Sequence, residues 1–134
     1  MTVALDTSAL VALHVPGVAR RVVQQALQLD QTWSASALAL SEALALIDHL
    51  TDEEVLRNDL EDALRHTWDY VAFVPVDQRC LNDAALLTRQ QPLQISDAIH
   101  LAAAMRLPPP IRFLTFDAGQ IPVALSLGFE VIST

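Results

Sequence analysis

Short apolar runs without polar alternation constrain the fold of this chain more than any other feature. They cover residues 2–5 (TVAL), 32–35 (TWSA), 71–74 (VAFV), 112–115 (RFLT) and 129–132 (FEVI). Segments with helical character separate them, at about 7–13, 18–29, 37–50, from Thr51 onward, 77–88, 97–105 and 121–127. Strands of this kind that alternate with helices are typical of a parallel sheet covered on both faces. We therefore predict an α/β fold with three layers, α/β/α, around a mainly parallel central sheet.

Helix starts are indicated by short polar residues that can accept hydrogen bonds from free backbone N–H groups. Asp6, Thr7 and Ser8 follow the first strand, and Ser36 and Ser96 precede two later helices. Thr51 with Glu54 three residues on has the form of a capping box. These positions predict where four of the helices begin.

Composition indicates one folded domain over residues 1–134. Apolar residues make up 52% of the chain and charged residues 18%, which argues against disorder. The net charge of −8 argues against broad adhesion to nucleic acid or anionic membranes. It does not exclude a nucleic-acid substrate, because bound divalent cations would reverse the sign of a local site. The lone Cys80, the absence of a signal-peptide pattern and the short uncharged stretches predict a cytoplasmic protein without a membrane span.

Four acidic residues lie within or beside apolar segments: Asp6, Glu42, Asp97 and Asp117. Burying an unpaired carboxylate costs several kcal/mol, so four such acids indicate carboxylates gathered around positive charge. A hard divalent cation such as Mg²⁺ or Mn²⁺ prefers oxygen ligands. Asp6 and Asp117 also follow predicted strands, and neighbouring parallel strands would bring them to the same edge of the sheet.

Each acid also has a purely structural explanation. Asp6 could cap a helix, Asp97 could complement a helix dipole, and Asp117 could belong to an ordinary turn. Glu42 is hardest to explain in this way, although a partly exposed helix edge would accommodate it. A metal site explains all four together and leaves open whether one ion or two are bound.

Other reactive residues give weaker signals. His100 lies one turn after Asp97 and could face the cleft, although a lone histidine on an apolar helix is more often packed or hydrogen-bonded. Cys80 has no partner and is predicted to be a buried, inert thiol. The sequence contains no nucleophile elbow, phosphate-binding loop or dinucleotide fingerprint.

Four motifs together resemble the PIN-domain family, and in particular its VapC-type toxins of toxin–antitoxin pairs. They are LDTSALVAL around Asp6, SALALSEALALI around Glu42, SDAIHLAAA around Asp97 and FLTFDAG around Asp117. The resemblance implies a ribonuclease that depends on Mg²⁺ or Mn²⁺, with these four acids at the metal. It also places Ser8 and Thr115 near the metal as weaker candidates, and implies a homodimer and a small antitoxin partner. The chain departs from the family pattern after Asp117, where basic residues are common and the sequence is Ala118-Gly119-Gln120.

The leading hypothesis is therefore a metal-dependent endoribonuclease that hydrolyses RNA phosphodiester bonds as the toxin of such a pair. One alternative is a PIN-fold interaction module with weak or no catalysis, which the acidic charge and the missing basic residues favour. Another is a different Mg²⁺-dependent phosphoryl-transfer enzyme. The sequence does not support a phosphoaspartyl phosphatase, because such an enzyme would need a D-x-D pair and the residue two positions after Asp6 is Ser8.

Overall fold

The computed structural model describes residues 2–134, so Met1, which the predicted single domain includes, lies outside the described residues. Five parallel strands form one sheet in the order β3-β2-β1-β4-β5. The strands are β1 (Thr2–Leu5), β2 (Thr32–Ser36), β3 (Val71–Val74), β4 (Ile111–Leu114) and β5 (Glu130–Ile132). The helices are α1 (Thr7–Ala12), α2 (Val18–Leu29), α3 (Ala37–Leu50), α4 (Glu54–Trp68), α5 (Gln78–Gln90), α6 (Ile95–Met105) and α7 (Ile121–Ser126). The predicted α/β fold with a parallel sheet is confirmed.

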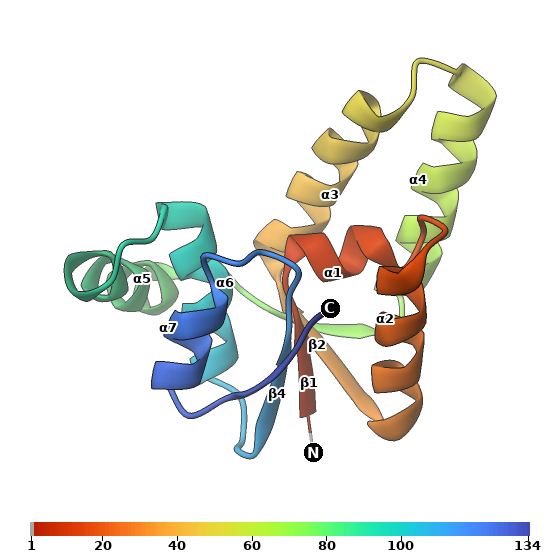
Figure 1. Cartoon of the computed structure of the whole chain (residues 1–134). Helices are drawn as coiled ribbons and strands as arrows, with labels where there is room; N and C mark the ends of the chain where they lie inside the picture. The colour runs from red at the N-terminus through yellow and green to blue at the C-terminus, as the bar shows by residue number, and fades with distance from the viewer. Residues whose placement is uncertain (1) are drawn as a thin grey trace.

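Both faces of the sheet are covered, which explains the unbroken apolar strands. Successive residues of a strand point to opposite faces. On β1, Val3 and Leu5 pack in a core cluster with residues of α1, α2, α3 and α4, whereas Ala4 packs in a second cluster with residues of α5, α6 and α7. Figure 1 shows these two groups of helices on opposite sides of the strands. The result is the predicted α/β/α arrangement.

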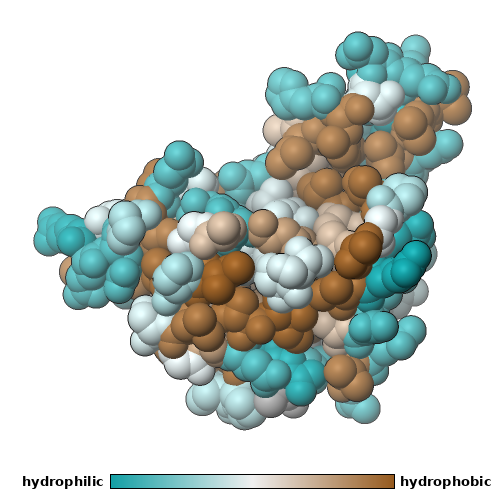
Figure 2. Space-filling view, in the orientation of Figure 1, coloured by the Kyte–Doolittle hydropathy of each residue, from teal (hydrophilic) through white to brown (hydrophobic). Residues whose placement is uncertain are grey.

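Helices α3 and α4 form a hairpin that projects from the body of the molecule (Figure 1). The hairpin packs on the body through Ala39, Ala43 and Leu64, which are buried in the same cluster as Val3 and Leu5 of β1. On the hairpin, Leu46, Leu50 and Leu56 are exposed. Figure 2 shows apolar residues along this hairpin and across the body below it, and hydrophilic residues at the tip of the hairpin and over α5.

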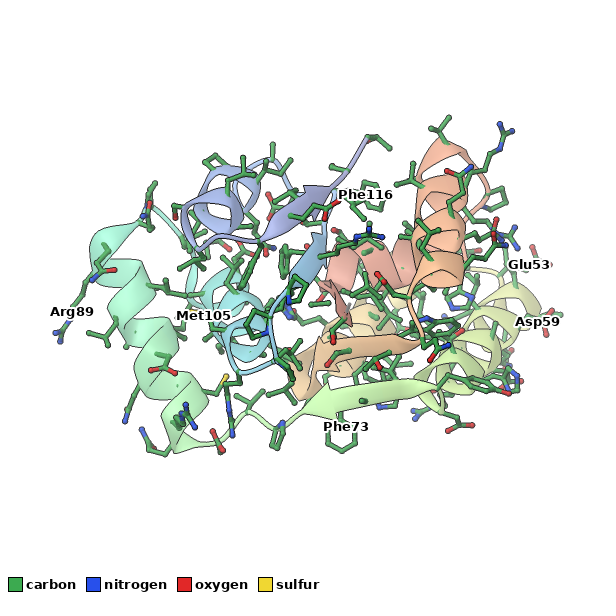
Figure 3. All side chains as sticks on the ribbon, turned by 90° about the horizontal axis from the view of Figure 1, so that it is seen from below. Glu53, Asp59, Phe73, Arg89, Met105 and Phe116 are labelled. Atoms are coloured by element: carbon green, nitrogen blue, oxygen red, sulfur yellow. The ribbon has the colours of Figure 1, made fainter. Side chains whose placement is uncertain are left out.

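The edge strand β3 carries an exposed aromatic residue. Phe73 points away from the sheet (Figure 3) and stacks on Trp68 with a ring-centroid distance of 6.1 Å and an interplanar angle of 14°. The opposite edge is β5, a strand of three residues. A short strand presents few free backbone groups to another chain.

Two of the predicted helix caps need correction. Helix α6 begins at Ile95 with Gln94 as N-cap, two residues before the position predicted from Ser96. Helix α4 begins at Glu54 with Glu53 as N-cap, and Thr51 instead accepts a hydrogen bond from the Glu53 amide at 3.1 Å, which forms a short turn.

Ser36 is the N-cap of α3, as predicted, but its hydroxyl makes no capping bond. Its Oγ lies 3.0 Å from Nδ1 of His100. The predicted cap at Asp6 is confirmed by a hydrogen bond of 2.9 Å from the amide of Ala9. Asp77, at the start of the predicted helix 77–88, caps α5 with a hydrogen bond of 2.9 Å from the amide of Cys80. Other element ends differ from prediction by one or two residues.

None of the helices within residues 2–134 is long and apolar enough to cross a membrane. Cys80 is buried in the α5–α6 cluster, as predicted, and burial raises the pKa of its thiol.

Candidate metal centre

The first and fourth strands bring two predicted site segments to the same edge of the sheet. Strands β1 and β4 are neighbours, with Leu5 paired to Leu114 in parallel register. The amide of Asp6 donates to the carbonyl oxygen of Leu114 at 3.2 Å, so the pairing continues to the first residue beyond β1. The segments that follow β1 and β4 therefore leave the sheet side by side at its carboxyl edge, which is the position predicted for Asp6 and Asp117.

A cavity of about 450 Å³ opens at this edge. Its lining includes all four predicted acids, which come from the β1–α1 junction, α3, α6 and the loop after β4: Asp6, Glu42, Asp97 and Asp117. Thr7, Ser8, His100 and Gln120 also contribute to the lining. Residues separated by more than a hundred positions in sequence thus share one polar cavity.

Asp6 is the most buried of the four acids, with 1% of its surface exposed. Its Oδ1 accepts hydrogen bonds from the amide of Ala9 at 2.9 Å and from the hydroxyl of Ser8 at 2.6 Å. Its Oδ2 accepts from the hydroxyl of Thr115 at 2.6 Å and from the amide Nε2 of Gln120 at 3.1 Å. A carboxylate has about four lone-pair positions. Protein donors therefore occupy all of them.

Ser8 and Thr115, the weaker predicted metal ligands, both direct their hydroxyl protons to Asp6. Each hydroxyl oxygen in turn accepts a backbone amide, that of Phe116 at 2.9 Å for Ser8 and that of Asp117 at 3.1 Å for Thr115. Ser8 lines the cavity, while Thr115 is fully buried behind it. In this arrangement the two hydroxyls fix the orientation of the Asp6 carboxylate.

Glu42 extends from α3 into the cavity and keeps 32% of its side chain exposed. Its Oε1 accepts a hydrogen bond from the Thr7 hydroxyl at 2.7 Å and contacts Nε2 of the buried His100 at 2.5 Å. Nδ1 of His100 lies against the Ser36 hydroxyl. Nε2 of His100 donates to the Glu42 carboxylate, and the Ser36 hydroxyl is the hydrogen-bond partner of Nδ1. His100 is thus hydrogen-bonded, as expected of a lone buried histidine, and its partner is one of the predicted acids.

Asp97 on α6 and Asp117 in the loop after β4 complete the acidic lining. Oδ1 of Asp97 accepts a hydrogen bond from Nε2 of Gln120 at 3.1 Å, so this one amide nitrogen bridges Asp6 and Asp97. Oδ1 of Asp117 accepts the amide of Gly119 at 2.9 Å. This bond closes a short turn that leads into α7. The turn interpretation of Asp117 and its place in the cavity lining are therefore both correct.

The surroundings of Asp6 and Asp97 disfavour the ionised forms of these two acids. Burial raises the pKa of Asp6, and the hydrogen bonds from Ser8, Thr115 and Ala9 oppose that rise. Burial also raises the pKa of Asp97, and the nearby charge of Asp117 adds to the effect. These acids therefore lack sufficient compensating positive charge within residues 2–134. A bound cation would supply it.

The oxygen-rich lining fits a hard divalent cation such as Mg²⁺ or Mn²⁺. Its buried oxygens include Oε1 of Gln120, which has no hydrogen-bond partner in the described part of the chain. Within residues 2–134, no three His, Cys, Asp or Glu side chains are close enough together to hold a metal ion by themselves. A cation here would thus need water or substrate oxygens to fill its shell, which is the usual situation for Mg²⁺.

A larger cavity of about 610 Å³ lies elsewhere, between the start of β2 and helices α2 and α4. It is lined by aromatic, amide, aliphatic and basic residues, among them Arg20, Trp33 and Tyr70, and by no carboxylate. Size alone would favour this cavity, but it lacks the ligands that a hard cation requires. We therefore assign the candidate metal centre to the smaller, acidic cavity.

Sequence reasoning missed two participants in the site. Thr7 was treated only as part of a helix cap, yet it donates to Glu42, 35 residues away. Gln120 was noted only because it is not basic, yet it contacts two of the four acids. Its neighbours Gly119 and Ile121 give no sign of a buried polar site, so no local signal could have identified it.

The parallel sheet and the cavity at its carboxyl edge define an α/β protein in which four carboxylates line one polar cavity. The PIN domain family model matches residues 3–124. The chain therefore belongs to the PIN-domain family. A comparison with curated proteins by sequence found no match.

Solved structures share the fold at low sequence identity. VapBC2 from Rickettsia felis, bound to a DNA fragment from its promoter, gives a TM-score of 0.72 at 11% identity, covering 100% of this chain and 99% of that chain. FitAcB from Neisseria gonorrhoeae gives a TM-score of 0.71 at 19% identity, covering 97% of this chain and 96% of that chain. VapBC-5 from Mycobacterium tuberculosis, a member of the VapBC family of toxin–antitoxin systems, gives a TM-score of 0.68 at 17% identity, covering 99% of this chain and 98% of that chain.

Proposed function

We propose that this protein is a Mg²⁺- or Mn²⁺-dependent endoribonuclease that acts as the toxin of a toxin–antitoxin pair. PIN domains are generally nucleases, and the similar structures named above include toxin–antitoxin proteins. One observation carries the proposal. Four carboxylates from separate elements, Asp6, Glu42, Asp97 and Asp117, line one cavity at the carboxyl edge of the sheet.

The residues of the cavity have distinct tasks in this proposal. A divalent cation at such a site offsets the charge of a phosphate group and activates water for attack. Glu42, partly exposed and oriented by Thr7 and His100, would be a ligand that can adjust to substrate. Asp6, held rigidly by its donors, would fix the position of the cation. Asp97 and Asp117 would add negative charge from two further sides.

The proposal is tested by cleavage of a mixed-sequence single-stranded RNA with Mg²⁺, with Mn²⁺ and with EDTA. Glu42→Gln keeps the shape of the side chain and removes its charge. Loss of residues behind metal ligands costs about 10–100-fold in activity, so loss of a ligand should cost about 100-fold or more. Glu61→Gln, the same change on the exposed face of α4, is the matched control and should retain wild-type activity.

Cleavage that is equal in EDTA, or equal in Glu42→Gln and wild type, would disprove the proposed mechanism. A third variant, Asp6→Asn, repeats the test at the buried acid. Its folding is checked by circular dichroism, because Asp6 also caps α1.

Two kinds of protein partner belong to the proposal. A small antitoxin would bind this chain, so the two proteins should co-purify. Substitutions that disrupt their interface should abolish the co-purification. A homodimer is supported by exposed apolar residues on the α3–α4 hairpin, including Leu46, Leu50 and Leu56. Equilibrium sedimentation at micromolar concentration should therefore give a dimer, and a monomer would contradict it.

A second candidate function is a protein-interaction module with little or no catalysis. It is favoured by the absence of arginine from the cavity lining within residues 2–134 and by the net charge of −8. Such a cavity offers no direct cationic contact for RNA phosphates. This candidate predicts tight binding of a small protein without metal-dependent turnover, so robust Mn²⁺-stimulated RNA cleavage would eliminate it.

A further inference from the structure

The side-chain amide of Gln120 is buried, and its nitrogen is hydrogen-bonded whereas its oxygen is not. The residue is 2% exposed, and its Nε2 lies 3.1 Å from both Oδ2 of Asp6 and Oδ1 of Asp97. Its Oε1 is buried and has no hydrogen-bond partner within residues 2–134. The reverse orientation of the amide would place its carbonyl oxygen against two carboxylates. The hydrogen bonds therefore determine which end faces the acids.

The amide nitrogen of Gln120 lies where a cation bridging Asp6 and Asp97 would be expected. Both carboxylates point one oxygen at it, and all four acceptor positions of Asp6 are filled by protein donors. A cation can bind Asp6 directly only if one donor leaves. The Ala9 amide is fixed in α1, and the hydroxyls of Ser8 and Thr115 are each held by a backbone amide as well.

Gln120 is the donor that is free to leave. Its backbone is fixed, because its amide donates to the Asp117 carbonyl at 3.0 Å and its carbonyl accepts from Ala124 at 2.9 Å. The side chain, in contrast, makes no hydrogen bond other than the two to Asp6 and Asp97 among the described residues. The residue also lines the cavity of about 450 Å³.

We propose that Gln120 is a placeholder for the divalent cation. In the metal-free protein its Nε2 bridges Asp6 and Asp97 and reduces their mutual repulsion. When a cation binds, the amide gives up these bonds and turns Oε1 toward the cation or a water in its shell. This inference rests on the proposed metal-dependent function, and it adds an uncharged oxygen from Gln120 to the four acids.

Binding of Mn²⁺, measured by calorimetry on the full chain, tests the placeholder. Gln120→Leu removes both ends of the amide at similar size, and it serves to assign the Gln120 signals and to measure the stability of the metal-free protein. Gln120→Glu removes the competing amide N–H groups, keeps an oxygen and adds a charge, and should tighten Mn²⁺ binding by about tenfold or more. The matched control Gln25→Leu makes the same change at an exposed position of α2, outside the lining of the acidic cavity, and should bind like wild type.

A second measurement follows the rotation itself. The side-chain NH₂ signals of Gln120 in a ¹⁵N correlation spectrum, assigned by their loss in Gln120→Leu, should shift strongly when the diamagnetic Mg²⁺ is added. Melting of metal-free Gln120→Leu should occur at a lower temperature than that of wild type, because the two acids lose their shared donor.

The outcomes separate the two proposals. Wild-type protein that binds Mn²⁺, combined with a Gln120→Glu affinity no tighter than that of wild type or an unmoved Gln120 NH₂ signal at saturating Mg²⁺, would overturn the placeholder and leave the nuclease proposal intact. Wild-type protein that binds neither ion would overturn both. If Gln120→Leu does not fold, Gln120→Glu and the NH₂ signals of wild type decide the matter.

Discussion

Replacing Thr115 with valine removes one hydroxyl behind the acidic cavity and leaves the side-chain shape nearly unchanged. Thr115 is fully buried, and its Oγ1 lies 2.6 Å from Oδ2 of Asp6. The same oxygen accepts the amide of Asp117 at 3.1 Å. The change therefore removes one donor from a buried carboxylate and one acceptor from the following loop.

The expected loss of stability follows from these two bonds. A hydrogen bond to a charged group contributes about 1.5–3 kcal/mol, and an ordinary one about 0.5–1.5 kcal/mol. We therefore expect the free energy of unfolding of Thr115→Val to fall by about 2–4 kcal/mol at neutral pH. Urea denaturation in EDTA measures it, with an unchanged m-value as the sign that the compactness of the two states is unaffected.

The loss should depend on pH in a defined direction. Burial raises the pKa of Asp6 above its ordinary value, and the bond from Thr115 opposes this because it favours the ionised form. As the pH falls through the raised pKa, Asp6 takes up a proton and its bond to Thr115 becomes an ordinary neutral one. The destabilisation should then shrink by about 1 kcal/mol.

Two comparisons make the prediction strict. Thr88→Val removes a hydroxyl that bonds only the Ala85 carbonyl on the exposed side of α5, so it should change stability by less than about 0.5 kcal/mol. Combining Thr115→Val with Asp6→Asn should give a coupling of about 1 kcal/mol. A loss below about 0.5 kcal/mol for Thr115→Val, or no coupling to Asp6, would refute the assignment of Thr115 as a support of the Asp6 carboxylate.

Three further expectations concern titratable groups. Because burial, followed by the charge of Asp117, raises the pKa of Asp97, the metal-free protein should lose stability as the pH rises from the ordinary value near 3.8 through the raised pKa; thermal melts in EDTA should show a shallower decline for Asp97→Asn. Burial lowers the pKa of His14, so stability should fall as the pH drops below 6.5, and His14→Gln should remove that part of the slope in urea titrations. Asp77→Ala removes the N-cap of α5 and should reduce the free energy of unfolding by about 1 kcal/mol, whereas a change below about 0.3 kcal/mol would contradict the capping role.

The layered fold was predictable because it depends on local patterns repeated along the chain. Each strand is a short apolar run bounded by polar residues, and this pattern can be recognised in each segment without knowing which strands pair with it. The positions of Asp6 and Asp117 after two strands also predicted a shared edge, which requires only that parallel strands end on the same side. The pairing of β1 with β4 makes this inference correct.

The hydrogen-bond partners within the site were not predictable. Gln120 and Asp6 are separated by 114 positions, and His100 and Ser36 by 64. Ser36 has the sequence position of a helix cap. Its hydroxyl instead pairs with the buried imidazole of His100 and makes no hydrogen bond to the amides at the start of α3. Such choices depend on which groups become buried together, and no segment of the sequence records that.

The donors around the acids explain how a cavity of this kind can bind a cation at all. Asp6 and Glu42 are held by hydroxyls, amides and one imidazole, and within residues 2–134 no arginine contacts either one. A guanidinium in the same place would neutralise the carboxylates permanently and block the cation, since arginine does not lose its proton in proteins. These donors fix the geometry of the carboxylates. Under the proposed function a divalent cation would offset their charge, and its binding should raise the melting temperature of the protein.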